Sequence, residues 1–73
     1  MILSDLGKMI KQKRKERGLT QENLAMEAGI SRTTLSKLEN GYFGNISVAT
    51  LDNLLAHLGY ELDVKVRNPF FNL

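Results

Sequence analysis

Residues 20–41 of this 73-residue chain read TQENLAMEAGISRTTLSKLENG, and this stretch decides the fold. Its apolar residues recur at helical spacing in two short runs. Gly29 separates the runs, because glycine tolerates the left-handed conformation that a sharp helix exit requires. Thr20 and Ser31 stand where each helix would begin, and both are favoured N-cap residues. The stretch therefore predicts two helices joined by a tight turn.

The second of these helices has a thin apolar stripe, Leu35 and Leu38, and a polar outer face. The outer face gathers hydrogen-bond donors that helical spacing places side by side: Arg32, Thr33, Ser36, Lys37 and Asn40. A short helix with this division suits insertion into the major groove of DNA, where such side chains can reach the base edges.

The same stretch closely resembles the helix-turn-helix of phage repressors and Cro proteins, the XRE type. The resemblance is carried by the combined spacing of Gln21, Leu24, Ala25, Gly29, Leu35, Leu38, Glu39, Asn40 and Gly41, and extends from about Leu6 to Gly59. It implies a mainly α, lambda-repressor-like domain of four to five helices. It also implies a bacterial, cytoplasmic repressor. Such a repressor would bind palindromic half-sites of an operator in double-stranded DNA as a homodimer, and it would be associated with the nucleoid while bound to DNA.

The resemblance assigns DNA contacts to particular side chains. Base readout is expected from Arg32, Thr33 and Lys37, with Ser31 and Ser36 in support. Arginine or lysine can donate to guanine O6 and N7, and threonine can bond a base or touch a thymine methyl. Phosphate contacts are expected from Gln21 and Asn40, from the hydroxyl of Tyr42 in the loop that follows, and from Lys8, Lys11 and Lys15 as further candidates.

The loop at residues 42–45, YFGN, departs from many related repressors, which place lysine or arginine there. We therefore expect weaker contacts between this loop and DNA. Phe43 has two interpretations, a core residue beneath the next helix or an exposed contact for DNA or a protein. Asn45 or Ser47 is expected to cap that helix, whose apolar face is Val48, Leu51, Leu54, Leu55 and Leu58 and which Gly59 would end.

The first helix is expected to begin at Ser4 and to bury Leu3, Leu6 and Ile10. Arg14 continues this inward stripe, which is unusual for a charged residue. In phage-repressor-like domains a matching arginine and glutamate form a partly buried ion pair, so the resemblance predicts a structural pair between Arg14 and Glu39.

Positive charge is concentrated at the start of the chain. Residues 1–18 carry six of the ten Lys and Arg but only two of the eight Asp and Glu. This distribution fits an electrostatic footprint for phosphate. A run of charge on a merely solvated helix face is the alternative.

The composition gives no basis for an enzyme, a metal site or a membrane protein. There is no cysteine, and the single histidine, His57, has no second histidine to complete a metal or nucleophilic site. No carboxylate pair stands out for acid–base chemistry. No apolar run approaches the roughly 18 residues of a membrane span. We therefore expect neither catalytic activity nor a cofactor.

The C-terminal residues 60–67, YELDVKVR, alternate as a half-buried strand does, with Tyr60, Leu62, Val64 and Val66 on one face. The chain offers no second strand to pair with it. An antiparallel strand from a twofold-related copy would satisfy its backbone groups. We thus divide the chain into a DNA-binding domain (1–59), a dimerisation strand (60–67) and a tail (68–73). In the tail, Phe70 and Phe71 would cover the dimer sheet or anchor a partner protein.

A helix-turn-helix followed by one strand resembles HipB-type antitoxins. That resemblance implies an autoregulatory antitoxin whose dimer binds a HipA-like kinase toxin. The alternatives are a phage-type regulator without a toxin, a protein-interaction module in which DNA binding is secondary, and a four-helix domain that shares the fold without binding DNA.

Replacing Val64 by proline should make the protein monomeric, because proline cannot donate to the strand ladder. Sedimentation of wild type and V64P at equal concentration checks this. A variant that still sediments as a dimer would rule out the strand interface.

Overall fold

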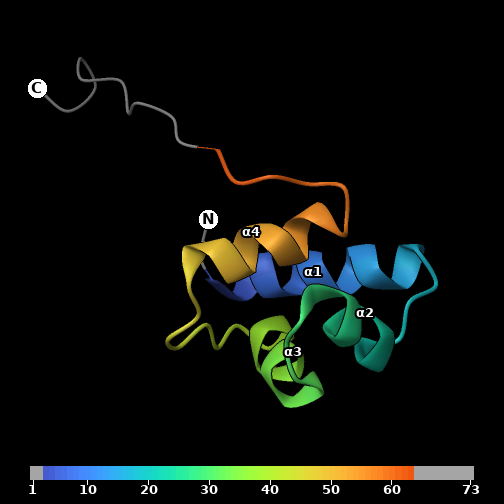
Figure 1. The fold of residues 1–73 in the computed structure, drawn as a ribbon, viewed down its shortest axis with the longest axis horizontal. Coiled ribbons are helices and arrows are strands. Elements are labelled where there is room, and N and C mark those ends of the chain that lie inside the picture. Colours follow the sequence, from blue (N-terminus) through green and yellow to red (C-terminus); the bar gives the residue numbers. More distant parts are fainter. Residues whose placement is uncertain (1–2, 64–73) are drawn as a thin grey trace, which may run out of the picture.

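The computed structural model describes residues 3–63, which form four helices. These are α1 (Leu3–Glu16), α2 (Gln21–Ala28), α3 (Arg32–Glu39) and α4 (Val48–Ala56). Helix α3 packs against both α1 and α2, and α2 packs against α4 (Figure 1). The mainly α architecture is thus confirmed, with four helices in the part of the chain that the structure describes.

The helix-turn-helix begins and ends where its capping residues predicted. The Thr20 hydroxyl accepts a hydrogen bond from the backbone N–H of Asn23, and the Ser31 hydroxyl accepts one from Thr34, both at 3.0 Å. Gly29 has φ 70°, the left-handed conformation, and Ile30 N–H then donates to the Ala25 carbonyl at 2.9 Å. This pattern closes the last turn of α2 and reverses the chain into α3.

One core joins the four helices. Its buried apolar residues are Ile10, Leu24, Ala25, Ala28, Leu35, Leu38, Phe43, Leu54, Leu55 and Leu58. Phe43 is 8% exposed, so the first interpretation of this aromatic residue, a core residue, is correct. Of the two candidate caps for α4, Ser47 fills the role, because its hydroxyl accepts from Thr50 N–H at 3.0 Å.

The contact between α1 and the end of α3 depends on Gly7, a residue that the sequence did not single out. A Cβ atom at this position would lie 2.4 Å from the Leu38 carbonyl oxygen and 2.9 Å from that of Glu39. Both oxygens belong to backbone, which cannot move aside as a flexible side chain can. The absence of a side chain at Gly7 therefore allows the two helices to approach.

Three predictions about the starts of α1 and α4 were wrong. Helix α1 begins at Leu3, so Ser4 lies inside it and does not cap it. Leu3 is 55% exposed and Val48 is 74% exposed, although both were expected in the core. Each stands in the first turn of its helix, where the apolar face extends past the packed neighbours.

Helix α4 itself ends at Ala56, and the turn that follows is closed at Gly59 as predicted. Gly59 has φ 84°, its N–H donates to the Ala56 carbonyl at 3.0 Å, and Tyr60 N–H donates to the Leu55 carbonyl at 2.9 Å.

Residues 60–63 follow α4 without forming a strand in the described part of the chain. Leu62 N–H donates to the Asp52 carboxylate at 3.3 Å, which ties this segment to α4. The Lys13 ammonium lies 5.8 Å from the centre of the Tyr60 ring. The Tyr60 side chain, and then Glu16, raise the pKa of Lys13. Val64, Val66 and the tail with Phe70 and Phe71 lie outside the described residues.

Candidate nucleic-acid interface

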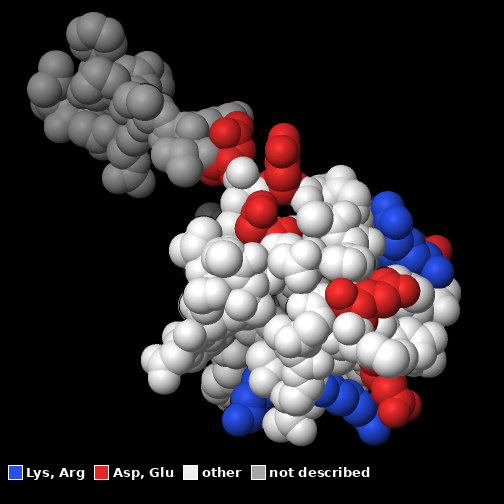
Figure 2. Space-filling model, in the orientation of Figure 1, with Lys and Arg blue, Asp and Glu red and all other residues white. Residues whose placement is uncertain are grey.

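The outer face of α3 presents the side chains that were predicted to read bases. Arg32, Thr33 and Lys37 are exposed, whereas Leu35 and Leu38 on the opposite side are buried. Basic atoms gather along the lower edge of the molecule in Figure 2, where α3 lies in Figure 1. The helix therefore has one side fixed in the core and the other free for a ligand.

A shallow hollow of about 310 Å³ brings α2 and α3 together on this face. It is lined by Gln21, Arg32, Thr33, Ser36 and Lys37. The structure thus gathers four of the five predicted base readers around one depression, with a predicted phosphate contact at its edge. The fifth, Ser31, is exposed at the start of α3, where its hydroxyl caps the helix and also donates to Thr34 Oγ1 at 2.9 Å.

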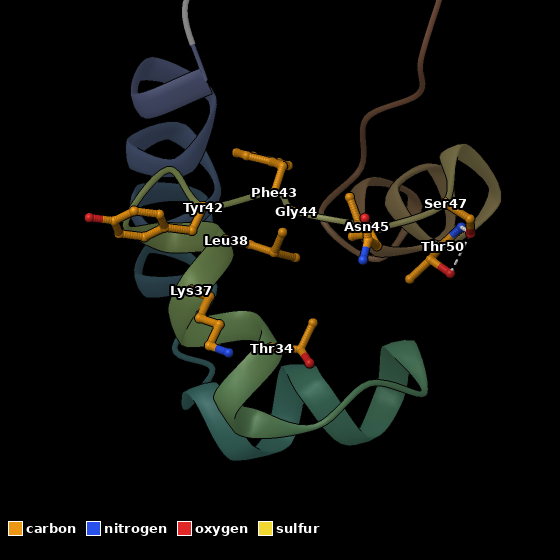
Figure 3. Close-up of a pocket in the computed structure, with 10 residues that line it drawn as sticks. Thr34, Lys37, Leu38, Tyr42, Phe43, Gly44, Asn45, Ser47 and Thr50 are labelled. Carbon is orange, nitrogen blue, oxygen red and sulfur yellow. Dashed lines mark hydrogen bonds between the residues drawn. The ribbon is translucent and has the colours of Figure 1, made fainter.

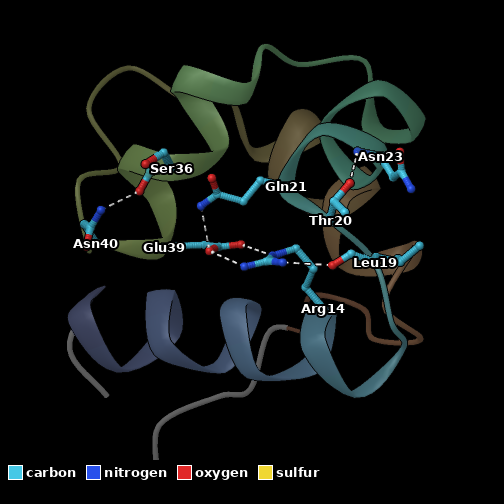
Figure 4. Close-up of polar contacts among 8 residues, drawn as sticks. All are labelled: Arg14, Leu19, Thr20, Gln21, Asn23, Ser36, Glu39 and Asn40. Atoms are coloured by element: carbon cyan, nitrogen blue, oxygen red, sulfur yellow. Dashed lines mark hydrogen bonds and ion pairs between the residues drawn. The ribbon is translucent and has the colours of Figure 1, made fainter.

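Beneath this face, Arg14 and Glu39 form a buried, bidentate ion pair (Figure 4). Arg14 Nε donates to Glu39 Oε2 at 2.7 Å, and Arg14 Nη2 donates to Glu39 Oε1 at 3.1 Å. The remaining nitrogen, Nη1, donates to the Leu19 carbonyl at 2.8 Å. Because both charges are almost fully removed from water, each depends on the other for compensation.

Gln21 joins this network, which the sequence did not predict. Its side-chain nitrogen donates to Glu39 Oε1 at 3.0 Å, so one carboxylate holds α1, α2 and α3 together. A primary amide carries two N–H groups and a carbonyl oxygen. Gln21 can therefore keep this bond and still offer a donor to a DNA phosphate. Asn40 is similar, since its amide nitrogen donates to the Ser36 carbonyl at 2.9 Å.

The loop between α3 and α4 borders a second hollow, of about 600 Å³ (Figure 3). Lys37 is the one cation among the residues that line it, and the others with polar side chains are threonines, Ser47, Asn45 and Tyr42. Tyr42 is 72% exposed, and its ring lies on the side of the loop away from α4. The loop thus offers neutral donors, as its sequence indicated.

The lysines of α1 lie on another part of the surface. Lys8, Lys11 and Lys15 are exposed and, with Gln12 and Glu16, line a shallow depression of about 550 Å³ along the helix.

Residues 3–63 were also searched for a metal site and for a membrane-spanning helix. No group of three His, Cys, Asp or Glu residues that could hold a metal occurs among residues 3–63. His57 Nδ1 lies 2.8 Å from the Asn53 carbonyl at the end of α4, which gives the histidine a local structural contact. The described helices also include none that is long and apolar enough to cross a bilayer.

Comparison with known proteins identifies the class. The Helix-turn-helix family model matches residues 10–65, and this chain belongs to that family. The matched range contains the whole of α2, α3 and the buried ion pair.

Curated relatives share its sequence over most of this chain. It is 41% identical over 56 residues to the uncharacterized HTH-type transcriptional regulator RghRB of Bacillus subtilis, covering 77% of this chain and 40% of that protein. It is 42% identical over 59 residues to the ImmF control region 10 kDa protein of Bacillus phage phi105, covering 81% of this chain and 64% of that protein. It is 38% identical over 58 residues to the putative antitoxin HigA2 of Mycobacterium tuberculosis, covering 80% of this chain and 57% of that protein. The chain thus spans about 40 to 64% of the length of these relatives.

Solved structures share the fold. The restriction-modification controller protein C.AhdI from Aeromonas hydrophila superposes with a TM-score of 0.72 at 30% identity, over 81% of this chain and 88% of that one. SinR, described as the master regulator for biofilm formation and solved in complex with DNA, superposes with a TM-score of 0.64 at 38% identity, over 73% of this chain and 84% of that one.

Replacing Glu39 by alanine should lower the free energy of unfolding by about 3–5 kcal/mol, because it strands the buried Arg14 guanidinium. It also removes the partner of the Gln21 amide. Urea unfolding followed by circular dichroism measures the change, with the exposed Glu22→Ala as the matched control. Equal midpoints for E39A and wild type would show that the pair does not stabilise the fold.

Proposed function

We propose that this chain is the DNA-binding module of a transcription regulator, a repressor that binds its operator as a homodimer and has no catalytic role. The observation that carries the proposal is the hollow shared by Gln21 and α3, where exposed donors converge on a helix held rigidly from behind. The solved complex of the related SinR with DNA supports it, as does the description of RghRB as a transcriptional regulator.

In this proposal the side chains divide between base and backbone contacts. Arg32, Thr33 and Lys37 read base edges, because they are exposed and lie on one helix face. Ser36 assists from the same hollow, and Ser31 assists from the start of α3, where its hydroxyl is hydrogen-bonded to the Thr34 hydroxyl. Phosphates are bound by the second N–H of the Gln21 and Asn40 amides and by the Tyr42 hydroxyl. The lysines Lys11 and Lys15 extend this set.

The homodimer would use residues 60–67. In support, Tyr60 and Leu62 are 42% and 40% exposed in the isolated chain, which leaves apolar surface for a partner to cover. A register centred on Val64 places Asp63 opposite Lys65 and Leu62 opposite Val66, whereas one centred on Asp63 would oppose two aspartates.

Within this function, the antitoxin role is supported by the resemblance to HipB-type antitoxins and by the 38% identity with the putative antitoxin HigA2. A HipA-like kinase toxin as partner rests on the first of these alone. The similarity to the ImmF control region protein of a phage favours the alternative, a phage-type regulator without a toxin. A module that mainly binds proteins is a further alternative, in which the DNA contacts are secondary.

Truncating Arg32 to alanine should weaken binding to the preferred duplex by about 1–3 kcal/mol and relax the preference at one base pair. Fluorescence anisotropy with the preferred duplex and its single-base variants measures both effects. Glu27→Ala, on the exposed surface of α2, is the control. Unchanged base preference in R32A would mean that the recognition face is misplaced.

A further inference from the structure

Asn40 and Gly41, at the end of α3, form the one Asn-Gly pair in the sequence. An asparagine before glycine is chemically labile, because glycine has no side chain to keep its backbone nitrogen away from the preceding amide. The other asparagines precede leucine, isoleucine or proline, which hinder the same reaction by bulk or by lack of an N–H: Asn23, Asn45, Asn53, Asn68 and Asn72. Asn40 is therefore the asparagine of this chain most open to loss of its amide.

The fold requires the glycine of this pair. Gly41 has φ 89°, a left-handed conformation that other residues adopt only at a cost. A Cβ atom at Gly41 would also lie 3.1 Å from the Cα of Ser4 in α1, which is closer than ordinary van der Waals contact. A larger residue after Asn40 would therefore disturb the contact between α1 and the end of α3, so the labile pair is a requirement of the fold.

The Asn40 side chain is exposed to water, but two hydrogen bonds restrain the groups that would react. The Asn40 amide nitrogen donates to the Ser36 carbonyl at 2.9 Å (Figure 4). The Gly41 backbone N–H donates to the Leu38 carbonyl at 2.9 Å, and it must lose this proton before its nitrogen becomes a nucleophile. Both bonds belong to the last turn of α3, so opening of this turn releases both groups together.

We propose that Asn40 is a self-modification site, which converts to aspartate or isoaspartate when the last turn of α3 opens. The Gly41 backbone nitrogen loses its proton to solvent and attacks Cγ of Asn40. A bond forms between this nitrogen and Cγ, the Cγ–Nδ2 bond breaks, and Nδ2 takes a proton from water and leaves as ammonia. The product is a cyclic imide.

Water then opens the imide. Its oxygen adds to one of the two imide carbons, the bond from that carbon to the Gly41 nitrogen breaks, and the nitrogen takes a proton. Addition at Cγ gives aspartate in an ordinary chain. Addition at the backbone carbonyl carbon of Asn40 gives isoaspartate, in which the chain runs through the side chain. Water is the only co-reactant, so the protein needs no enzyme for this step.

The product places a carboxylate where the fold uses an amide. A carboxylate only accepts hydrogen bonds, so it can donate neither to the Ser36 carbonyl nor to a DNA phosphate. Its charge stands at the carboxyl end of α3, where the helix dipole disfavours an anion, and directly after the buried Glu39. Conversion therefore loosens the end of α3 and repels the DNA backbone. The effect on DNA rests on the proposed function, whereas the reaction itself does not.

The test incubates the wild-type protein at mildly alkaline pH, which favours loss of the Gly41 proton. Peptide mass spectrometry should find the amide-to-acid exchange at Asn40 before any other asparagine, with isoaspartate among the products. Guanidinium chloride should accelerate the exchange about tenfold or more, because unfolding breaks both restraining hydrogen bonds. The variant N40Q, verified as folded by circular dichroism, should form no new acidic species in the same time, because a glutamine amide would have to close a larger ring.

Ion-exchange chromatography separates converted from unconverted wild-type protein of one incubation, which gives a matched control for DNA binding. The converted fraction should bind the preferred duplex about tenfold more weakly, as expected for loss of one hydrogen bond to a charged group.

The outcomes separate this inference from the proposed function. Exchange at another asparagine first, or equal rates with and without guanidinium chloride, overturns the site as proposed. Equal affinities of the two fractions overturn its effect on DNA binding. Unconverted protein that binds no duplex overturns the proposed function, while the mass spectra still test the site.

Discussion

The structure depends on one buried carboxylate, that of Glu39. Its side chain is 2% exposed and accepts hydrogen bonds from Arg14 of α1 and Gln21 of α2, while it belongs to α3 itself. A domain of this size buries little apolar surface, and a charge without compensation in its core would be costly. The ion pair therefore fixes the three helices in one arrangement, and Gly7 allows α1 to approach closely enough for it to form.

This arrangement gives α3 one side that packs in the core and one side that is exposed. The inward side of α3 is occupied by Leu35, Leu38 and Glu39, so its backbone cannot shift without disturbing the core. The outward side makes local hydrogen bonds at the Ser31 cap and between the Asn40 amide and the Ser36 carbonyl. Its Arg32, Thr33 and Lys37 side chains remain exposed. Gln21 connects the packed side and the exposed side, because its amide is bonded to Glu39 and its side chain also lines the hollow that contains Arg32. Rigid placement of a few donors is what base readout requires.

Much of the fold could be predicted from the sequence, because its signals are local. The caps at Thr20 and Ser31 and the left-handed Gly29 need only a few neighbouring residues to be recognised. Helical periodicity identified the inward face, but it could not say how far the packing extends, so Leu3 and Val48 were misplaced in the core. The role of Gly7 depends on a distance between helices that no sequence pattern encodes.

The candidate site was predicted in part for a similar reason. The residues on the outer face of α3 follow from spacing, and the structure places four of them around one hollow. The link between Gln21 and Glu39 could not be found from the sequence, because the two residues lie 18 positions apart and only the packing of α2 on α3 joins them. The charge asymmetry of residues 1–18 was visible, but the sequence could not show that Lys13 lies over the Tyr60 ring while Arg14 is bound to Glu39 of α3.

We propose that α3, fixed from behind by Glu39, reads base sequence. The most direct measurement is selection from a randomised duplex library by the purified protein at physiological salt, followed by sequencing of the bound pool. If α3 reads bases in a homodimer, the bound pool should be enriched in an inverted repeat whose half-sites share a short common sequence. A bound pool with the same sequence distribution as the starting library would contradict it, because binding would then be phosphate attraction alone.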